Sequence, residues 1–421
     1  MKLTWVNHAS YVLEGYGVKM IADPWIEGRV FNRSWSHLAP SVFTYADFES
    51  ITHIWFSHEH PDHFFPPNIS KIPKEYRQQI TVFFQETIDK RVIHFCQTMG
   101  FKSVVEVPAG KPYAINEHLT ALVVKVKNDT DSWMYLQTPD KCILNLNDCV
   151  LDEADEKTLL ELVPKVDVLM TQFSFANWIG NANQQALMKQ AADDKKKEMA
   201  RYIKLVNPKQ VIPFASYVWF CAKSNFHFNT HANTIDQIYT YLQSLNVEPL
   251  VFYPGDEWDF ESPVDASSAI ARYMDHVGAL RLEECTDFET ISFDELRNVT
   301  EKARKRALDF NNRLKLYTYA PFSAYLTDTD EVVEFDYRSG LKKNSSVTRD
   351  QADIALHSQN LKVCFEQDYG FDTILIAGTF EKPEKGDFNR FMEYEWVAGL
   401  NNQGKRMKGF LGRIMDRLMK N

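Results

Sequence analysis

Four side chains that could bind metal ions stand close together near the start of the chain: His58, His60, Asp62 and His63. Imidazole and carboxylate groups at this spacing are ligands that zinc and iron accept. The chain has 12 histidines among 421 residues, so chance explains three within this short stretch poorly. The stretch therefore predicts a metal site, and with it the activation of water or of dioxygen.

The stretch begins where a predicted strand ends. Residues 51–55 are β-branched and aromatic, which is typical of a buried strand, and Pro61 ends the extended run. Side chains alternate along an extended chain, so the first two histidines face the same way. The break at Pro61 turns the carboxylate and the third histidine toward a second point, and this geometry suits two cations better than one.

Other predicted strand ends supply further candidates. His8 and Asp23 follow the outer strands of an N-terminal hairpin, in loops where function concentrates, although His8 could instead bond the adjacent strand. Asp148 comes just past a buried strand, where a carboxylate is costly unless a cation or a donor meets it. Asp129 and Asp131 are alternative ligands from one polar turn, where Asp is also common for local reasons.

Strands and helices alternate around these positions, which indicates an α/β layer. Residues 114–146 change to a period of two and predict an antiparallel segment. Beyond residue 262 the pattern changes again, with a predicted helical region at 288–316, predicted strands at 317–335 and 371–380, and an amphipathic tail at 381–421. We therefore expect a metal-binding catalytic domain over 1–262 and a C-terminal α+β domain of unknown role over 263–421.

Composition narrows the function classes. The net charge of −10 argues against nucleic acid as a partner, whereas an anionic small-molecule substrate stays open because a metal site can outweigh it. No apolar run is long enough to span a membrane and no signal peptide precedes the first strand, so we expect a cytoplasmic protein. The six cysteines are scattered, which predicts reduced thiols and no iron–sulfur cluster.

Together these motifs resemble the metallo-β-lactamase superfamily, in the subgroup of ascorbate-phosphate lactonase and N-acylphosphatidylethanolamine phospholipase. The resemblance rests on the His-x-His-x-Asp-His stretch after a strand and on Asn7-His8-Ala9-Ser10, Asp23-Pro24-Trp25 and Asn147-Asp148. It implies a four-layer αβ/βα sandwich with a metal pair at one edge of two packed sheets, followed here by a C-terminal α+β extension.

A closer resemblance is to the part of the CMP-N-acetylneuraminate hydroxylase family that follows the Rieske domain. It rests on Asp23-Pro24-Trp25-Ile26-Glu27-Gly28, Asp129 and Asp131, Asn147-Asp148-Cys149, Pro213-Phe214-Ala215-Ser216-Tyr217, Pro254-Gly255 and Tyr369-Gly370-Phe371-Asp372-Thr373. The sequence departs from hydrolytic members of the superfamily, because Asp129 or Asp131 replaces a histidine and Ala215-Ser216 replaces another. Carboxylate-rich ligand sets favour iron or manganese over zinc.

The resemblance implies two interpretations. In the favoured one, a dinuclear-iron oxygenase hydroxylates a sugar, nucleotide-sugar or N-acyl substrate with electrons from a separate donor protein. In the other, two zinc or manganese ions activate water to hydrolyse an ester, lactone, amide or phosphodiester. The expected ligands are His58, His60 and Asp129 or Asp131 for one ion and Asp62 and His63 for the other, with Asp148 bridging. Catalytic roles are expected for Asp62, His8 and Asp23.

Overall fold

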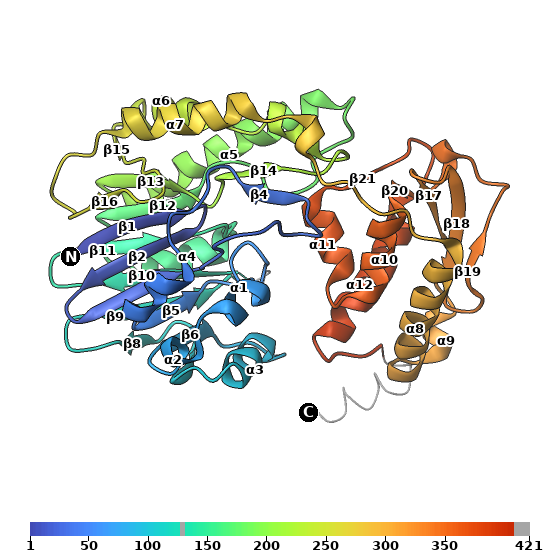
Figure 1. Cartoon of the computed structure of the whole chain (residues 1–421), viewed down its shortest axis with the longest axis horizontal. Coiled ribbons are helices and arrows are strands. Elements are labelled where there is room, and N and C mark those ends of the chain that lie inside the picture. The colour runs from blue at the N-terminus through green and yellow to red at the C-terminus, as the bar shows by residue number, and fades with distance from the viewer. Residues whose placement is uncertain (127–130, 408–421) are drawn as a thin grey trace.

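The computed structural model describes residues 1–126 and 131–407. Within this part, two seven-stranded sheets face one another and helices cover their outer surfaces (Figure 1). A five-stranded sheet with its own helices follows in the C-terminal part. The predicted fold class, a four-layer αβ/βα sandwich with a C-terminal α+β extension, is confirmed.

The first sheet has the strand order β16-β1-β2-β3-β5-β6-β7. Its strands are β1 (Lys2–Asn7), β2 (Ser10–Gly15), β3 (Val18–Ala22), β5 (His53–Phe56), β6 (Thr81–Gln85), β7 (Ser103–Val107) and β16 (Glu257–Trp258). Strands β3, β5, β6 and β7 run parallel to one another. Their carboxyl ends therefore meet at one edge of the sheet, where loops can bring side chains together.

Strand β5 shows how both faces of this sheet are buried. Ile54 and Phe56 pack into an outer cluster with residues of the neighbouring helices, whereas Trp55 packs into the core between the two sheets. This alternation follows from the two-residue period of a strand. The elements over the outer face are η1 (Tyr45–Ser50), α1 (Pro66–Lys71), α2 (Lys74–Arg77) and α3 (Arg91–Thr98).

The second sheet has the order β15-β13-β12-β11-β10-β9-β8. Its strands are β8 (Pro112–Ala114), β9 (Thr120–Lys125), β10 (Ser132–Gln137), β11 (Cys142–Asn145), β12 (Val168–Gln172), β13 (Gln210–Phe214) and β15 (Glu248–Pro249). The elements associated with it are α4 (Glu153–Leu162), α5 (Gln185–Val206), α6 (Ile235–Gln243), α7 (Ala266–Ala279), η2 (Phe226–Thr230) and a ribbon of β4 (Trp35–His37) with β14 (Val218–Phe220). The antiparallel segment predicted at 114–146 corresponds to β9, β10 and β11.

The C-terminal part contains a mixed sheet of order β19-β18-β17-β20-β21. Its elements are η3 (Leu282–Glu284), α8 (Phe293–Phe310), α9 (Arg313–Leu316), β17 (Phe322–Leu326), β18 (Glu331–Asp336), β19 (Gly340–Lys343), η4 (Arg349–Gln351), β20 (Ile354–Leu356), α10 (Ser358–Glu366), α11 (Gly370–Ala377), β21 (Phe380–Glu381) and α12 (Phe388–Asn402). Figure 1 shows α10, α11 and α12 between this sheet and the N-terminal sandwich.

The strand predicted at 371–380 is wrong, because the chain forms α11 over most of it. A short apolar run is compatible with either a buried strand or a buried helix, and periodicity alone does not distinguish them. Here Gly370 lets the helix begin in close contact with the carbonyl of Val363, a position that excludes any side chain. Burial against two layers then explains why the run is apolar on several faces.

The three largest hydrophobic clusters of the described residues divide between the two parts of the chain, two in the sandwich and one in the C-terminal part. The C-terminal core draws its buried residues from Ile291 to Met407, and Tyr273 of α7 packs instead into the core of the sandwich. The domain boundary at residue 262 stays a prediction, and from this packing we would place it after α7. Among the residues that the structure describes, every helix is too short or too polar to pass through a lipid bilayer.

Candidate metal centre

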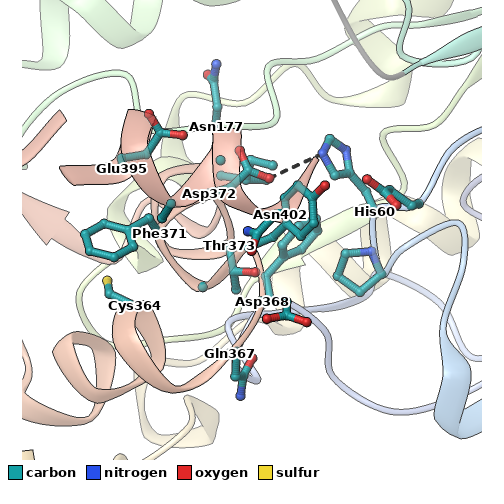
Figure 2. Close-up of a pocket in the computed structure, with 18 of the residues that line it drawn as sticks. His60, Asn177, Cys364, Gln367, Asp368, Phe371, Asp372, Thr373, Glu395 and Asn402 are labelled. Carbon is teal, nitrogen blue, oxygen red and sulfur yellow. Dashed lines mark ion pairs between the residues drawn. The ribbon is translucent and has the colours of Figure 1, made fainter. Parts of the chain in front are cut away.

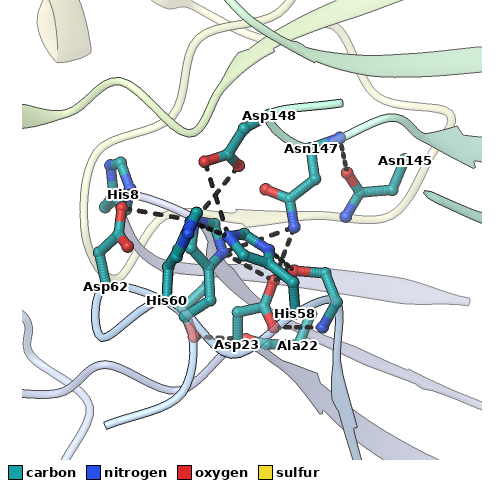
Figure 3. Close-up of polar contacts among 12 residues, drawn as sticks. His8, Ala22, Asp23, His58, His60, Asp62, Asn145, Asn147 and Asp148 are labelled. Atoms are coloured by element: carbon teal, nitrogen blue, oxygen red, sulfur yellow. Dashed lines mark hydrogen bonds and ion pairs between the residues drawn. The ribbon is translucent and has the colours of Figure 1, made fainter. Parts of the chain in front are cut away.

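Loops at the ends of several strands meet at one edge of the sandwich. Because β3 and β5 are parallel, Asp23 at the end of β3 lies beside residues 57–63, which follow β5. Asp148 follows β11 in the second sheet, and His8 lies between β1 and β2. Figure 3 shows these side chains converging on one region.

A first ligand group consists of His58, His60 and Asp131, whose ligand atoms all lie within 4.8 Å of one another. Nε2 of His58 is 2.9 Å from Nδ1 of His60 and 3.6 Å from Oδ1 of Asp131. The two imidazoles thus present different ring nitrogens to the same point. Of the two carboxylates predicted as alternatives, Asp131 lies in this group, and Asp129 lies outside the described residues.

A second ligand group surrounds His63. Its Nε2 is 3.2 Å from Oδ1 of Asp148 and 3.4 Å from Oδ2 of Asp62. The same oxygen of Asp62 is 3.3 Å from Nε2 of His8. The other oxygen of Asp148 lies 3.9 Å from Nε2 of His58, so this carboxylate stands between the two groups.

Three buried atoms of these groups make no hydrogen bond of good geometry within the described part of the chain: Oδ1 of Asp62, Nε2 of His63 and Oδ1 of Asp148, the last two of which meet only as an ion pair at 3.2 Å. Buried polar atoms without hydrogen bonds are costly, and charged ones most of all. A cation at their point of convergence would satisfy them together. The set of imidazoles and carboxylates therefore fits a pair of divalent metal ions.

The protonation states differ among the candidate ligands. Burial would lower the pKa of His60 and of His63, yet the carboxylates beside them raise the first to about 10 and the second well above its ordinary value, so both rings carry a proton that a metal ion must displace. Burial lowers the pKa of His58 well below its ordinary value, and the neighbouring His63 lowers it further. Burial would raise the pKa of Asp148, yet the charge of His63, its contact with the carboxylate and the charge of His58 together lower this pKa to about 2. His58 is thus neutral and Asp148 anionic near neutral pH, and these are the protonation states in which both side chains bind metals.

Asp23 lies behind the second group. Its Oδ2 is 3.0 Å from Nδ1 of His63 and accepts hydrogen bonds from Oγ of Ser57 and Nδ2 of Asn147. Its Oδ1 accepts from the amide of Ser57. Asp23 is fully buried and contacts the ring nitrogen of His63 that points away from the ligand groups. From this placement Asp23 would orient His63. The catalytic role predicted for Asp23 stays a prediction.

Replacing Asp23 by asparagine is expected to weaken binding of the ion beside His63 by about 10- to 100-fold, as for other groups behind a metal ligand. The amide has one acceptor oxygen where the carboxylate has two, so His63 loses its fixed orientation and tautomer. Titration of the metal-free protein with Zn²⁺ against a chelator measures the change, with the exposed Asp275→Asn variant as a control. Equal affinities of both variants would contradict a positioning role for Asp23.

A cavity of about 1660 Å³ adjoins the ligand groups. His60, Asp62 and Asp148 line it from the sandwich, and α11 and α12 contribute lining residues from the C-terminal part (Figure 2). Ligand sites are typically concave and bordered by a few polar groups, which this cavity provides beside the candidate metal centre. Asp372 also lines the cavity. No role was predicted for it from the sequence, although residues 369–373 were part of the resemblance to the hydroxylase family.

Comparison with known proteins finds matches to part of the chain. The profile described as "Beta-lactamase superfamily domain" matches residues 2–215. Cytidine monophosphate-N-acetylneuraminic acid hydroxylase of Danio rerio is 24% identical over 230 residues, which cover 51% of this chain and 38% of that protein. The Xenopus laevis enzyme of the same name is 24% identical over 232 residues, or 52% and 38% of the two chains. The matched segment thus spans well under half the length of these relatives.

Solved structures of both oxygenases and hydrolases are similar to the chain. CmlA, a diiron beta-hydroxylase from Streptomyces venezuelae, has 14% identity and a TM-score of 0.44, over 61% of this chain and 53% of that one. An isothiocyanate hydrolase from Delia radicum gut bacteria has 15% identity and a TM-score of 0.45, over 62% and 99%.

Proposed function

The chain belongs to the beta-lactamase superfamily, and from this premise we propose that it is a metal-dependent enzyme acting on a small molecule in the cavity beside two divalent metal ions. The observation that carries the proposal is the convergence of two ligand groups on Asp148. A single carboxylate shared between two such groups is suited to hold two ions close together. Two-metal sites of this kind orient a substrate and stabilise the charge that develops on it.

The ligands divide between the two ions according to the distances. His58, His60 and Asp131 would hold the first ion, and Asp148 would contact both. His63 and Asp62 would hold the second ion, together with His8, whose Nε2 faces the same oxygen of Asp62. We therefore assign His8 the role of a ligand, and Asp62 the additional task of orienting the reacting molecule toward the cavity.

The reaction that we favour is hydroxylation. Reduced iron, when bound, supplies the activation of dioxygen that side chains alone cannot perform. Support comes from the three carboxylates among the ligands and from the hydroxylases that match half of the chain. By analogy with those relatives, the substrate is a sugar, a nucleotide-sugar or an N-acyl compound. The reaction also needs electrons, and we propose that a separate donor protein delivers them.

A second candidate reaction is hydrolysis of an ester, lactone, amide or phosphodiester by two zinc or manganese ions. The observation that favours it is His8, because a second imidazole beside His63 makes this group richer in nitrogen, as zinc sites often are. In this case the chain's own contribution is to hold a water molecule near Asp62 and to keep the substrate's reacting bond within the cavity.

Metal content distinguishes the two reactions. Protein produced in iron-supplemented and in zinc-supplemented cultures is desalted, and its metals are counted by mass spectrometry. Two irons per chain, with dioxygen uptake in the presence of a chemical reductant and no turnover of a lactone and phosphodiester panel, is the expected result. Two zinc ions in both cultures with turnover of that panel would overturn the oxygenase. Protein without stoichiometric metal would overturn both reactions.

A further inference from the structure

Helix α11 lies at the boundary between the two parts of the chain, and the sandwich binds it near both ends. Near its carboxyl end, the carbonyl of Ala377 accepts a hydrogen bond from Nδ2 of Asn225, and the carbonyl of Leu375 accepts one from the amide of Trp178. Both donors belong to the sandwich half of the sequence. The carboxyl end of α11 is therefore fixed relative to the metal centre.

The amino end is fixed by Tyr369, the residue before the helix. The guanidinium of Arg91 lies 3.9 Å from the centre of the Tyr369 ring, and the Tyr369 hydroxyl donates a hydrogen bond of 3.2 Å to Asp89. Arg91 also pairs with Glu59, which stands within the histidine stretch itself. This set of contacts connects the start of α11 to the metal-binding loop.

Asp372, in the first turn of α11, faces His60 across the cavity (Figure 2). Its Oδ2 is 3.7 Å from Nε2 of His60, whereas Nδ1 of the same ring is 2.9 Å from Nε2 of His58. His60 thus directs one nitrogen toward the first ligand group and the other toward the C-terminal part. At 3.7 Å the two side chains form an ion pair, and the carboxylate lies on the side of the ring that carries Nε2, where it is placed to accept the Nε2 proton.

We propose that Asp372 is a positioning residue of the metal centre, supplied by the C-terminal part of the chain. It holds the proton of His60 on Nε2 and leaves Nδ1 free to bind the first ion. Asp23 contacts His63 in the same way, with the difference that Asp372 is carried by helix α11 of the C-terminal part. The inference rests on the proposed two-metal function.

The alternative to a positioning role is that Asp372 binds the substrate. The side chain of Asp372 is 40% exposed, so a substrate could reach it. The fixed ends of α11 favour the positioning role. They hold the carboxylate of Asp372 opposite Nε2 of His60, which is the ring nitrogen that does not face the first ligand group. The two roles differ in one measurable respect: positioning changes the affinity for metal without any substrate, and substrate binding does not.

The test is competition for Zn²⁺ between the metal-free protein and a chelator, with the absorption spectrum of the Co²⁺-loaded protein as a second readout. We expect Asp372→Ala to weaken one of the two metal equivalents by about 10- to 100-fold and to change the Co²⁺ spectrum. The other equivalent should change little. Asp372→Glu should restore part of the affinity. Asp372→Asn keeps the shape of the side chain, and it replaces Asp372→Ala as the test variant if the alanine variant does not fold.

Asp368→Asn is the matched control, since Asp368 lines the same cavity and is exposed. It should leave both affinities and the spectrum unchanged. Wild-type affinity and an unchanged spectrum in Asp372→Ala would overturn the inference alone. Failure of the wild-type protein to bind two Zn²⁺ ions would overturn the proposed function as well, so the two failures are distinguishable.

Discussion

We expect the Asp148→Ala variant to fold but to retain neither metal ion. Its turnover should fall by more than about 100-fold, which exceeds the loss typical of residues that only support a metal ligand. The physical reason is the position of Asp148: one oxygen lies 3.2 Å from His63 and the other 3.9 Å from His58. Loss of this carboxylate removes negative charge from both ligand groups at once. Mass spectrometry of the desalted protein measures the metals, and dioxygen uptake or hydrolysis measures the turnover.

The control for this prediction is Asp275→Ala, which removes a carboxylate from the exposed side of α7. It should retain both ions and full turnover. One ion retained in Asp148→Ala would show that this carboxylate serves a single site. Two ions retained would contradict the ligand assignment altogether.

Exchange of Gly370 for alanine should have the largest effect on stability. A Cβ atom at this position would lie 1.9 Å from the carbonyl oxygen of Val363, and the contact involves backbone on both sides. Relief requires α11 to move away from α10, which opens the C-terminal core around Phe371 and Ile374. We expect the free energy of unfolding to fall by about 3 kcal/mol or more, which is at or above the largest losses usual for overpacked core sites. Urea unfolding measures the free energy, and hydrogen exchange locates the change in α11.

Gly278→Ala is the matched control because this glycine lies inside helix α7 and a Cβ atom added there would have no neighbouring atom within 4 Å. Here alanine should stabilise the protein by up to about 1 kcal/mol through helix propensity. Equal stabilities of the two variants would contradict the packing of α11. If Asp372 positions His60, Gly370→Ala should also weaken the affinity for the first ion.

Much of the fold could be predicted from the sequence because its signals are local. The β-branched run before the histidine stretch forms β5, and its alternation places Trp55 between the sheets and Phe56 toward the outer helices. The resemblance to the metallo-β-lactamase superfamily and to CMP-N-acetylneuraminate hydroxylase is confirmed by the matches to known proteins. The spacing of His58 and Asp62 also predicted their divergence toward two points, which the two ligand groups display.

Other features depend on contacts that no local pattern contains. The strand predicted at 371–380 is α11, since a short apolar run does not show whether one layer or several will cover it. The positioning geometry of Asp23 depends on Asn147, which is distant in sequence and reaches it only in the folded sandwich. The contact between His60 and Asp372 joins residues from two parts of the chain with separate cores. These are tertiary relationships, and neither periodicity nor spacing along the sequence encodes them.

The cavity has one wall from the sandwich, with apolar side chains such as Phe64 and Phe175, and the other from the C-terminal core, with Phe335 and Phe371. The region after α7 thus contributes to the shape of the cavity, whereas all the candidate metal ligands lie before it in the sequence. Chimeras that exchange the region after α7 between homologues should accept different molecules and keep the same metals. If Asp372 positions His60, such a chimera should keep its affinity for the first ion only where the exchanged segment carries an acidic residue opposite His60.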